Sequence, residues 1–387
     1  MPVIDVPSPA FMDDEEISIF ADAVGKFYAK HAPEKRVLQW REDGQVEREF
    51  WREAGEAGLL GASVPEEYGG HGGDFRHEMV VIDQQGQHNV DGFAASLHNT
   101  IILPYLVRHG TEEQKKKYLP KLVSGELVSA IAMTEPGVGS DLQSITTTAL
   151  KDGNGYRING AKTYISNGQI ADFIIVVAKT DPNERAKGIS LMLLETEGAE
   201  GFQRGKKLDK IGLDAQDTSE LFFDDVFVPG DAVLGGEEGK GFYQLMGELP
   251  QERLIIAMGA ISTIERALEE TVAFTKDRKA FGKTIWDFQN TQFTLADLKA
   301  RGTAAKIFVN DCIAKHLEGK LDVPTACMAK YWVTELQGEV VDKCLQLHGG
   351  SGYINDYPIA RMYRDSRITR IFGGSNEIMK MVIARSM

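Results

Sequence analysis

The chain has 387 residues, of which 42% are hydrophobic, and carries a formal net charge of −14 with an isoelectric point near 5.2. Such a chain can bury a large core and divide into two or three domains. The acidic balance argues against binding to nucleic acid or to an anionic membrane surface, because both require a basic face. No apolar run is long enough to span a membrane, and MPVIDVPSPAFMDDEE lacks the basic start and apolar core of a signal peptide. We therefore expect no membrane insertion and a cytoplasmic location.

The cysteines and histidines show no metal-binding or disulfide pattern. Cys312, Cys327 and Cys344 lie inside helical patterns with no short pairing motif, so we expect reduced, buried thiols. The eight histidines form no HExxH motif and no Cys/His cluster. The sequence therefore predicts no metal site.

Helical patterns fill the first third of the chain. Ile17, Phe20, Val24 and Phe27 share one helical face after an acidic first turn, which predicts a helix over 13–31. Further helices are predicted over 49–58, 76–88, 92–109 and 112–124. The glycine cluster GGHGGD at 69–74 interrupts them.

The pattern changes near residue 143, where β-branched residues and turn signals replace helical spacing up to residue 228. Helical patterns return over 252–276, 287–317, 323–347 and 376–386. The predicted fold class is α+β. It comprises an N-terminal helical domain (1–130), a middle antiparallel β domain (131–238) and a C-terminal helical domain (239–387) of the four-helix-bundle type. Because no repeat or flexible linker separates these parts, they should pack as one unit.

The stretch from Met246 to Lys283 contains the most informative helix. Pro250 is suited to the first turn of a helix, because its missing N–H is not needed there. The apolar residues that follow share one face: Leu254, Ala257, Met258, Ile261, Ile264 and Leu268. Glu252 is then expected in the first turn, beside a buried stripe. A glutamate there more often complements the helix dipole than performs chemistry, and both interpretations stay open at this point.

Three loops contain small residues that allow a ligand to approach the backbone closely. They are AMTEPGVGSD at 132–141, QLHGGSGY from Gln346 and FGGSNE from Phe372. The first has hydroxyl and N–H donors suited to a planar heterocycle or a phosphate, although it is equally suited to a simple interdomain turn. The sequence contains no G-x-G-x-x-G or Walker-type motif, so a nucleotide cofactor would have to bind in another way.

Taken together, the segments AMTEPGVGSD, YISNG, DRKAFGK, QLHGG with GYINDYP, and FGGSNEIM resemble the acyl-CoA dehydrogenase family from about Asp13 to the C-terminus. The resemblance implies an FAD enzyme of three domains, usually a homotetramer. It would convert an acyl-CoA thioester to the trans-2-enoyl-CoA, as in fatty-acid β-oxidation. An electron-transferring flavoprotein would accept the electrons.

The matching motifs also imply cofactor and substrate contacts. Residues of the first two segments would contact the flavin ring: Ala132, Met133, Thr134, Gly139, Ser140, Tyr164, Ile165 and Ser166. Residues of the later segments would hold the pyrophosphate and adenosine, in the family partly across a subunit interface: Arg278, Phe281, Gln289, Gln346, Leu347, His348, Gly349, Gly350, Ser375, Asn376 and Glu377. Substrate contacts would come from Ser140, Tyr243, Arg253 and Gly374. Tyr164 replaces the tryptophan of many members but keeps an aromatic face for the flavin.

The resemblance also indicates the base. Many members carry their catalytic glutamate at the position of Gly373, which has no side chain. Long-chain and isovaleryl-CoA dehydrogenases place the glutamate on the earlier helix instead, and LPQERLIIA matches the long-chain type closely. The resemblance therefore identifies Glu252 as the base, with a pKa raised by the exclusion of water. The backbone N–H of Gly373 would stabilise the developing oxyanion.

Three alternatives are kept. A branched-chain or isovaleryl-type dehydrogenase would use the same fold and base. An acyl-CoA oxidase would pass electrons to oxygen, although such enzymes usually carry an additional C-terminal domain. A flavin-free scaffold would bind no acyl-CoA, and the intact cofactor segments argue against it.

Overall fold

The computed structural model describes residues 2–387, and its N-terminal part is helical as predicted. The helices are α1 (Glu15–His31), α2 (Glu34–Asp43), α3 (Arg48–Glu56), α4 (Phe75–Gln87), α5 (Ala95–Leu97), α6 (Leu103–His109) and α7 (Glu112–Val123). Helix α1 buries Ile17, Val24 and Phe27, and Asp14 caps it by accepting a hydrogen bond from the backbone N–H of Glu16.

The single helix predicted over 92–109 is interrupted. Helix α5 begins only at Ala95, and a π-helical turn, η3 (His98–Ile102), joins it to α6. Two buried polar side chains of η3 bond to other elements, because His98 Nε2 lies 2.9 Å from the Leu122 carbonyl and Asn99 Nδ2 lies 2.7 Å from that of Leu59. Such tertiary bonds hold a turn that local sequence preference does not predict.

The middle part forms a seven-stranded sheet with the order β1-β4-β2-β3-β7-β6, and β5 also pairs with β4. Its strands are β1 (Ser129–Ala132), β2 (Thr148–Asp152), β3 (Gly155–Ser166), β4 (Phe173–Lys179), β5 (Ile189–Glu195), β6 (Phe202–Lys207) and β7 (Thr218–Pro229). The antiparallel prediction was wrong at β1, which pairs with β4 in parallel, and β2 also meets β4 in parallel at Thr148 and Lys179. Strands β2 and β3 intervene between β1 and β4, and this long connection allows the parallel pairing.

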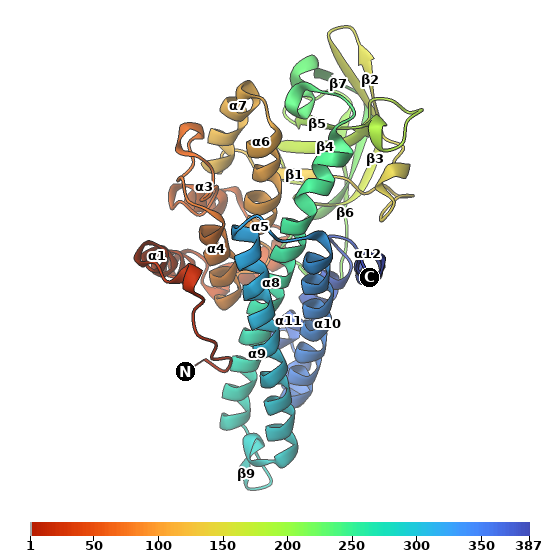
Figure 1. Ribbon diagram of the computed structural model, residues 1–387. Coiled ribbons are helices and arrows are strands. Elements are labelled where there is room, and N and C mark those ends of the chain that lie inside the picture. Colours follow the sequence, from red (N-terminus) through yellow and green to blue (C-terminus); the bar gives the residue numbers. More distant parts are fainter. Residues whose placement is uncertain (1) are drawn as a thin grey trace.

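The C-terminal part returns to helices: α8 (Gly241–Asp277), α9 (Gln289–Leu317), α10 (Val323–His348), α11 (Pro358–Ser366) and α12 (Asn376–Arg385). A small hairpin of β8 (Lys279–Ala280) and β9 (Lys283–Thr284) connects α8 to α9. Helices α8, α9 and α10 run side by side away from the sheet, and the hairpin lies at their far end (Figure 1). They share one apolar core that includes Leu254, Leu298 and Val340.

Helix α8 begins nine residues before Pro250, so the predicted helix start was wrong. The proline removes only one intrahelical hydrogen bond. The turn before it is stabilised by tertiary contacts, because Leu245 is buried and buried Glu248 pairs with Arg108 and His109 of α6. Glu252 therefore lies in the helix interior, and complementing the helix N-terminus does not explain it.

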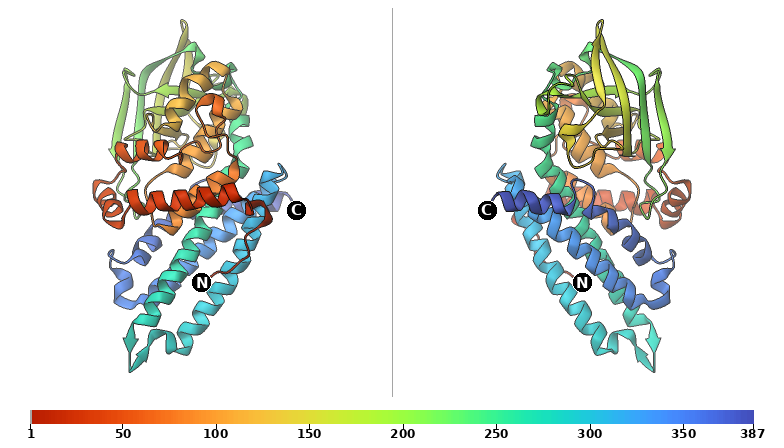
Figure 2. Two further views of the ribbon diagram at one scale, coloured as in Figure 1. Left: turned by 90° about the vertical axis from the view of Figure 1, so that its left-hand side faces the viewer. Right: turned by 90° about the vertical axis from the view of Figure 1, so that its right-hand side faces the viewer.

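The three parts pack against one another, as expected. The N-terminal helices lie beside the sheet in both views of Figure 2, and the long C-terminal helices project away from it. One apolar cluster joins Leu106 of α6, Leu119 of α7, Phe173 of β4 and Leu245 of α8. The first half of α8 therefore lies where all three parts meet.

The three cysteines are free and buried, which confirms that prediction. Within residues 2–387, none of the helices combines the length and apolar character that a bilayer span requires, and no group of three His, Cys, Asp or Glu side chains is arranged to hold a metal ion.

Candidate active site

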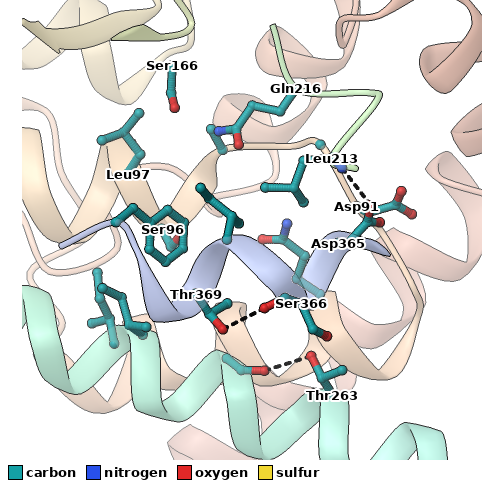
Figure 3. A pocket seen from close by; sticks show the side chains of 18 of the residues that line it. Asp91, Ser96, Leu97, Ser166, Leu213, Gln216, Thr263, Asp365, Ser366 and Thr369 are labelled. Carbon is teal, nitrogen blue, oxygen red and sulfur yellow. Dashed lines mark hydrogen bonds between the residues drawn. The ribbon is translucent and has the colours of Figure 1, made fainter. Parts of the chain in front are cut away.

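A cavity of about 470 Å³ lies where α8 meets the N-terminal helices and the sheet. Residues from one face of α8 line it, at steps of three or four: Glu252, Ile255, Ile256, Gly259 and Thr263. Helix α4, the loop after it, α5 and η3 contribute mainly apolar side chains, among them Ile82, Phe93, Leu97 and Ile101. In Figure 3, Leu97 and Ser166 lie across the cavity from Thr263. The size and apolar lining are those of a small-molecule site.

Among the acids that line this cavity, Glu252 alone forms no ion pair with a side chain of residues 2–387. Its side chain is 6% exposed, and the Tyr105 hydroxyl donates a 2.8 Å hydrogen bond to its Oε1. Burial raises the pKa of Glu252 to about 7, and the charge of Glu248 adds to this, while the Tyr105 hydrogen bond and Arg253 oppose it. A carboxylate with such a pKa can take up or release a proton near neutral pH.

The other acids near the cavity are held by cations. Asp91 and Asp365 both pair with the Arg41 guanidinium, and Asp365 also accepts the backbone N–H of Leu213 (Figure 3). Glu135, just beyond the cavity loop, lies 3.0 Å from Lys162 Nζ, and that charge together with hydrogen bonds lowers its pKa to about 2, against the effect of burial. Ion pairs of this kind give these acids structural roles.

The turn of α8 that bears Glu252 is tied to α6 and to η3. Arg108 donates to Gln251 Oε1 at 2.7 Å, and Gln251 Nε2 donates to the Thr100 carbonyl at 2.7 Å. Arg108 and His109 also contact Glu248 one turn earlier, with His109 Nε2 3.1 Å from Glu248 Oε1. These contacts fix the orientation of the glutamate-bearing turn relative to the N-terminal helices.

Gly373 reaches the same cavity from the loop before α12. Its φ is +62°, a conformation that favours glycine, and a Cβ there would lie 2.4 Å from Ile256 Cδ1. The following Gly374 has its carbonyl bound by Lys330 Nζ at 2.8 Å. The loop can therefore present its backbone to a ligand, whereas a side chain at this position would have to displace Ile256.

The structure brings part of the predicted flavin set to the cavity. Met133, Thr134, Tyr164, Ile165 and Ser166 line it, and Tyr164 is 69% exposed with a φ of +60°. The rest of the first segment does not line the cavity: Ala132 is buried at the end of β1, and Gly139 and Ser140 are exposed in the loop that follows.

The second predicted set lies far from the cavity within one chain. Arg278 and Gln289 are exposed near the β8–β9 hairpin, and Phe281 at its turn is 95% exposed. The segment Gln346, Leu347, His348, Gly349 and Gly350 ends α10, and the ring of His348 stacks on Phe274 with centroids 4.2 Å apart. None of these residues lines the cavity.

The remaining predicted residues surround the two glycines or the start of α8. Ser375 and Glu377 begin α12, and buried Asn376 accepts from Lys330 at 2.9 Å. Tyr243 is exposed in the first turn of α8, and Arg253 points toward α10, where it donates to Cys327 Sγ at 3.2 Å. Gly374, Tyr243 and Arg253 do not line the cavity in this chain.

Sequence patterns did not indicate Tyr105 or Gly259. Tyr105 is one apolar-patterned residue of a short helix, 147 positions before its hydrogen-bonding partner. Gly259 is a helix-interior glycine whose added Cβ would meet nothing within 4 Å. For Gly259, the available signal was the presence of glycine inside a helix despite its low helix propensity.

Comparison with known proteins agrees with this architecture. Three family models match in succession: acyl-CoA dehydrogenase N-terminal domain at 14–126, middle domain at 130–226 and C-terminal domain at 239–387. Long-chain specific acyl-CoA dehydrogenase of Sus scrofa mitochondria is 49% identical over 374 residues, which cover 96% of this chain and 86% of that protein. Isovaleryl-CoA dehydrogenase of Pongo abelii mitochondria is 37% identical, covering 96% and 88%.

Among solved structures, acyl-CoA dehydrogenase from Geobacillus kaustophilus superposes with a TM-score of 0.94 at 46% identity, covering 96% of this chain and 98% of that one. The matches span all three parts, including the helix that carries Glu252 and the loop that carries Gly373. The chain belongs to the acyl-CoA dehydrogenase family of oxidoreductases.

Proposed function

We propose that the protein catalyses the FAD-dependent α,β-dehydrogenation of an acyl-CoA thioester to the trans-2-enoyl-CoA, with Glu252 as the base. The observation that carries this proposal is one buried carboxylate, without a cationic partner, on the wall of a large apolar cavity. Its pKa of about 7 suits proton abstraction at neutral pH.

The residues around the cavity fit a flavin. Tyr164 offers an exposed aromatic face, and Met133, Thr134 and Ser166 beside it provide a polar and sulfur-bearing edge for a heterocyclic ring. A structural relative with a bound flavin is the glutaryl-CoA dehydrogenase of Mycobacterium smegmatis, described in complex with FADH2, which is 26% identical with a TM-score of 0.90. Bound FAD would supply the acceptor for the hydride that leaves Cβ.

Glu252 would take the α-proton. The carboxylate must be ionised to accept it, so the O–H bond forms at Glu252 while the Cα–H bond breaks. Oε1 is already bound by Tyr105, and among residues 2–387 no hydrogen bond reaches Oε2. Oε2 is therefore the atom proposed to receive the proton.

Gly373 would stabilise the negative charge that develops on the thioester oxygen. A backbone N–H serves this purpose without a side chain, and its position is set by the bond from Lys330 to the next residue, Gly374.

The acyl chain would lie along α8. From Glu252 to Thr263 the cavity wall follows the helix for eleven residues, or about 16 Å at 1.5 Å per residue. Its lining by Ile82, Ile101 and Ile255 suits an apolar chain, and the length of the wall supports a long one. A branched-chain dehydrogenase would use the same base. Turnover of straight and branched acyl-CoAs would distinguish the two functions.

A second copy of the chain and an electron-transferring flavoprotein are proposed partners. Arg278, Phe281 and Gln289 are exposed and do not line the cavity of their own chain, which supports an oligomer in which they serve a neighbour; a homotetramer is proposed. A cytoplasmic location stays a prediction, and the long-chain and isovaleryl relatives are named as mitochondrial proteins.

The test is turnover of straight, branched and ring-bearing acyl-CoAs by the purified flavoprotein, with electron-transferring flavoprotein or oxygen as acceptor. Flavoprotein-linked turnover that falls by about 10²–10⁴ in Glu252→Gln, with flavin retained, is expected. Rapid oxygen consumption would favour the oxidase alternative. Near wild-type turnover in Glu252→Gln would remove Glu252 from the mechanism.

A further inference from the structure

The hydrogen bond between Tyr105 and Glu252 joins two parts of the chain at the proposed base. Tyr105 belongs to α6 of the N-terminal helices, and its hydroxyl oxygen lies 2.8 Å from Oε1 of Glu252 on α8. Tyr105 is 0% exposed and Glu252 6% exposed, so the pair is shielded from bulk solvent. A hydrogen bond to an ionised group in such surroundings is a strong one.

We propose that Tyr105 is a positioning residue that holds one carboxylate oxygen of Glu252, directs the other to substrate and favours the ionised form. This inference rests on the proposed function, since it concerns the base of that reaction. Tyr105 does not line the cavity and acts only through Glu252.

The direction of the effect follows from the donor. Burial and the neighbouring carboxylates raise the pKa of Tyr105 well above its ordinary value, so the phenol stays protonated. It can then donate its O–H to a carboxylate oxygen, and this stabilises the charged form of Glu252. Without that donor, less would counteract the effect of burial, and the pKa of Glu252 would rise further. The base would then stay protonated up to a higher pH.

Other charged groups near Glu252 define the background for this effect. On α8 itself Glu248 raises the pKa of Glu252 and Arg253 lowers it. From α6, Arg108 and His109 are engaged with Glu248. Three groups on the other packed helices face these neighbours rather than the Glu252 carboxylate: His316 of α9, and Cys327 and Lys330 of α10. Arg361, Asp365 and Arg266 line the cavity with it.

The chain offers a matched control. Tyr28 is also 0% exposed, and its hydroxyl has no hydrogen-bonding partner among the described residues. Tyr28→Phe therefore removes the same atom from a buried ring without touching the base. Tyr105→Phe removes the atom that bonds Glu252, and both variants keep the packing of the ring.

The experiment titrates the Glu252 carboxyl by infrared difference spectroscopy of the flavin-loaded protein without substrate, using Glu252→Gln as the blank. Tyr105→Phe is expected to raise the carboxyl midpoint by about one pH unit or more, the size of a lost charge-assisted hydrogen bond. The acidic limb of kcat/KM against pH should move by the same amount, with turnover recovering toward pH 9. Tyr28→Phe should leave both unchanged.

Two results would overturn the inference. One is a carboxyl midpoint in Tyr105→Phe equal to that of the wild type. The other is a loss of turnover that is uniform across pH, because that marks a purely structural role. Failure of the proposed function has a different signature: Glu252→Gln would keep its turnover, whatever the infrared titration of Tyr105→Phe gives.

Discussion

Lys330 donates a 2.8 Å hydrogen bond to the carbonyl of Gly374 and a 2.9 Å bond to Asn376 Oδ1, from a side chain that is wholly buried. No carboxylate lies within ion-pair distance of this ammonium among residues 2–387, and burial lowers its pKa to about 8. Burying an ammonium without a carboxylate partner is unfavourable. Here the buried Lys330 holds the loop of Gly373, the proposed oxyanion donor, against α10.

Replacing Lys330 by methionine should therefore lower kcat more than it raises KM. The loop would lose its anchor, and the Gly374 carbonyl would lose the donor that holds it, whereas Asn376 Oδ1 keeps a weaker bond from Thr334. A fall in kcat of at least about tenfold is expected, since one oxyanion donor contributes more than that when lost outright. Lys343→Met, at a partly exposed position of the same helix, is the control. If both variants had the same kcat and KM, Lys330 would have no part in positioning the loop for the reaction.

Burial of Glu252 predicts a pH-dependent cost in stability. Its pKa rises from 4.5 to about 7 on folding, so between these values the folded protein holds a proton that the unfolded chain has released. Stability therefore decreases as pH rises through this window, and the loss is complete above it. Glu252→Gln should be more stable than the wild type at pH 8, by up to roughly 3 kcal/mol, and equal near pH 4.

Chemical denaturation at several pH values measures this difference. Glu112→Gln is a useful contrast, because a hydrogen bond from Tyr68 and the nearby Lys115 lower the pKa of Glu112 instead. Its substitution should give no gain at pH 8. If the stability difference between Glu252→Gln and the wild type did not change with pH, the pKa of Glu252 would not be raised by folding.

Chain-length preference should respond to Gly259. This glycine lines the cavity two turns beyond Glu252, and an added Cβ would meet open space. Gly259→Leu should leave short acyl-CoAs nearly unaffected and raise KM for long ones, because the new side chain fills the path along α8. It should also stabilise the helix by up to about 1 kcal/mol. Steady-state kinetics on a straight-chain series measures the change.

Gly247→Leu provides the comparison, since Gly247 is an exposed glycine of the same helix with equally open surroundings. It should stabilise the helix without altering the chain-length profile. If both leucine variants kept the wild-type profile, the acyl chain would not pass Gly259.

Moving the base to residue 373 should require more than exchanging the two side chains. Glu252→Gly with Gly373→Glu places a side chain at φ +62°, with Cβ 2.4 Å from Ile256 Cδ1. A non-glycine residue in this conformation is strained by about 1 kcal/mol or more, and the contact with Ile256 adds to it. We expect measurable turnover only when Ile256→Ala is added.

Flavin absorbance and turnover of the double and triple variants test this expectation. The triple variant should exceed the double variant in turnover while both retain flavin. A double variant that already matched the triple one would show that the loop relaxes without space from Ile256.

The family resemblance gave the candidate base, and the helix and strand patterns gave the order of the three parts. Local patterns failed where distant contacts decide the outcome. Pro250 is suited to a helix start by its own geometry, yet the contacts of Glu248 with α6 extend the helix to Gly241. The parallel pairing of β1 and β4 likewise depends on how two later strands are inserted, which periodicity does not encode.

The sequence by itself determined that one glutamate lies on a helix with a buried apolar face and that residue 373 has no side chain. Only the tertiary structure decided that this carboxylate is enclosed, lacks a cation and is bound by Tyr105. The same holds for the exposed residues of the β8–β9 hairpin, which lie beyond reach of their own cavity. The physical reason is that residue type and spacing set which groups share a face, whereas burial, charge and pKa depend on the elements that pack against it.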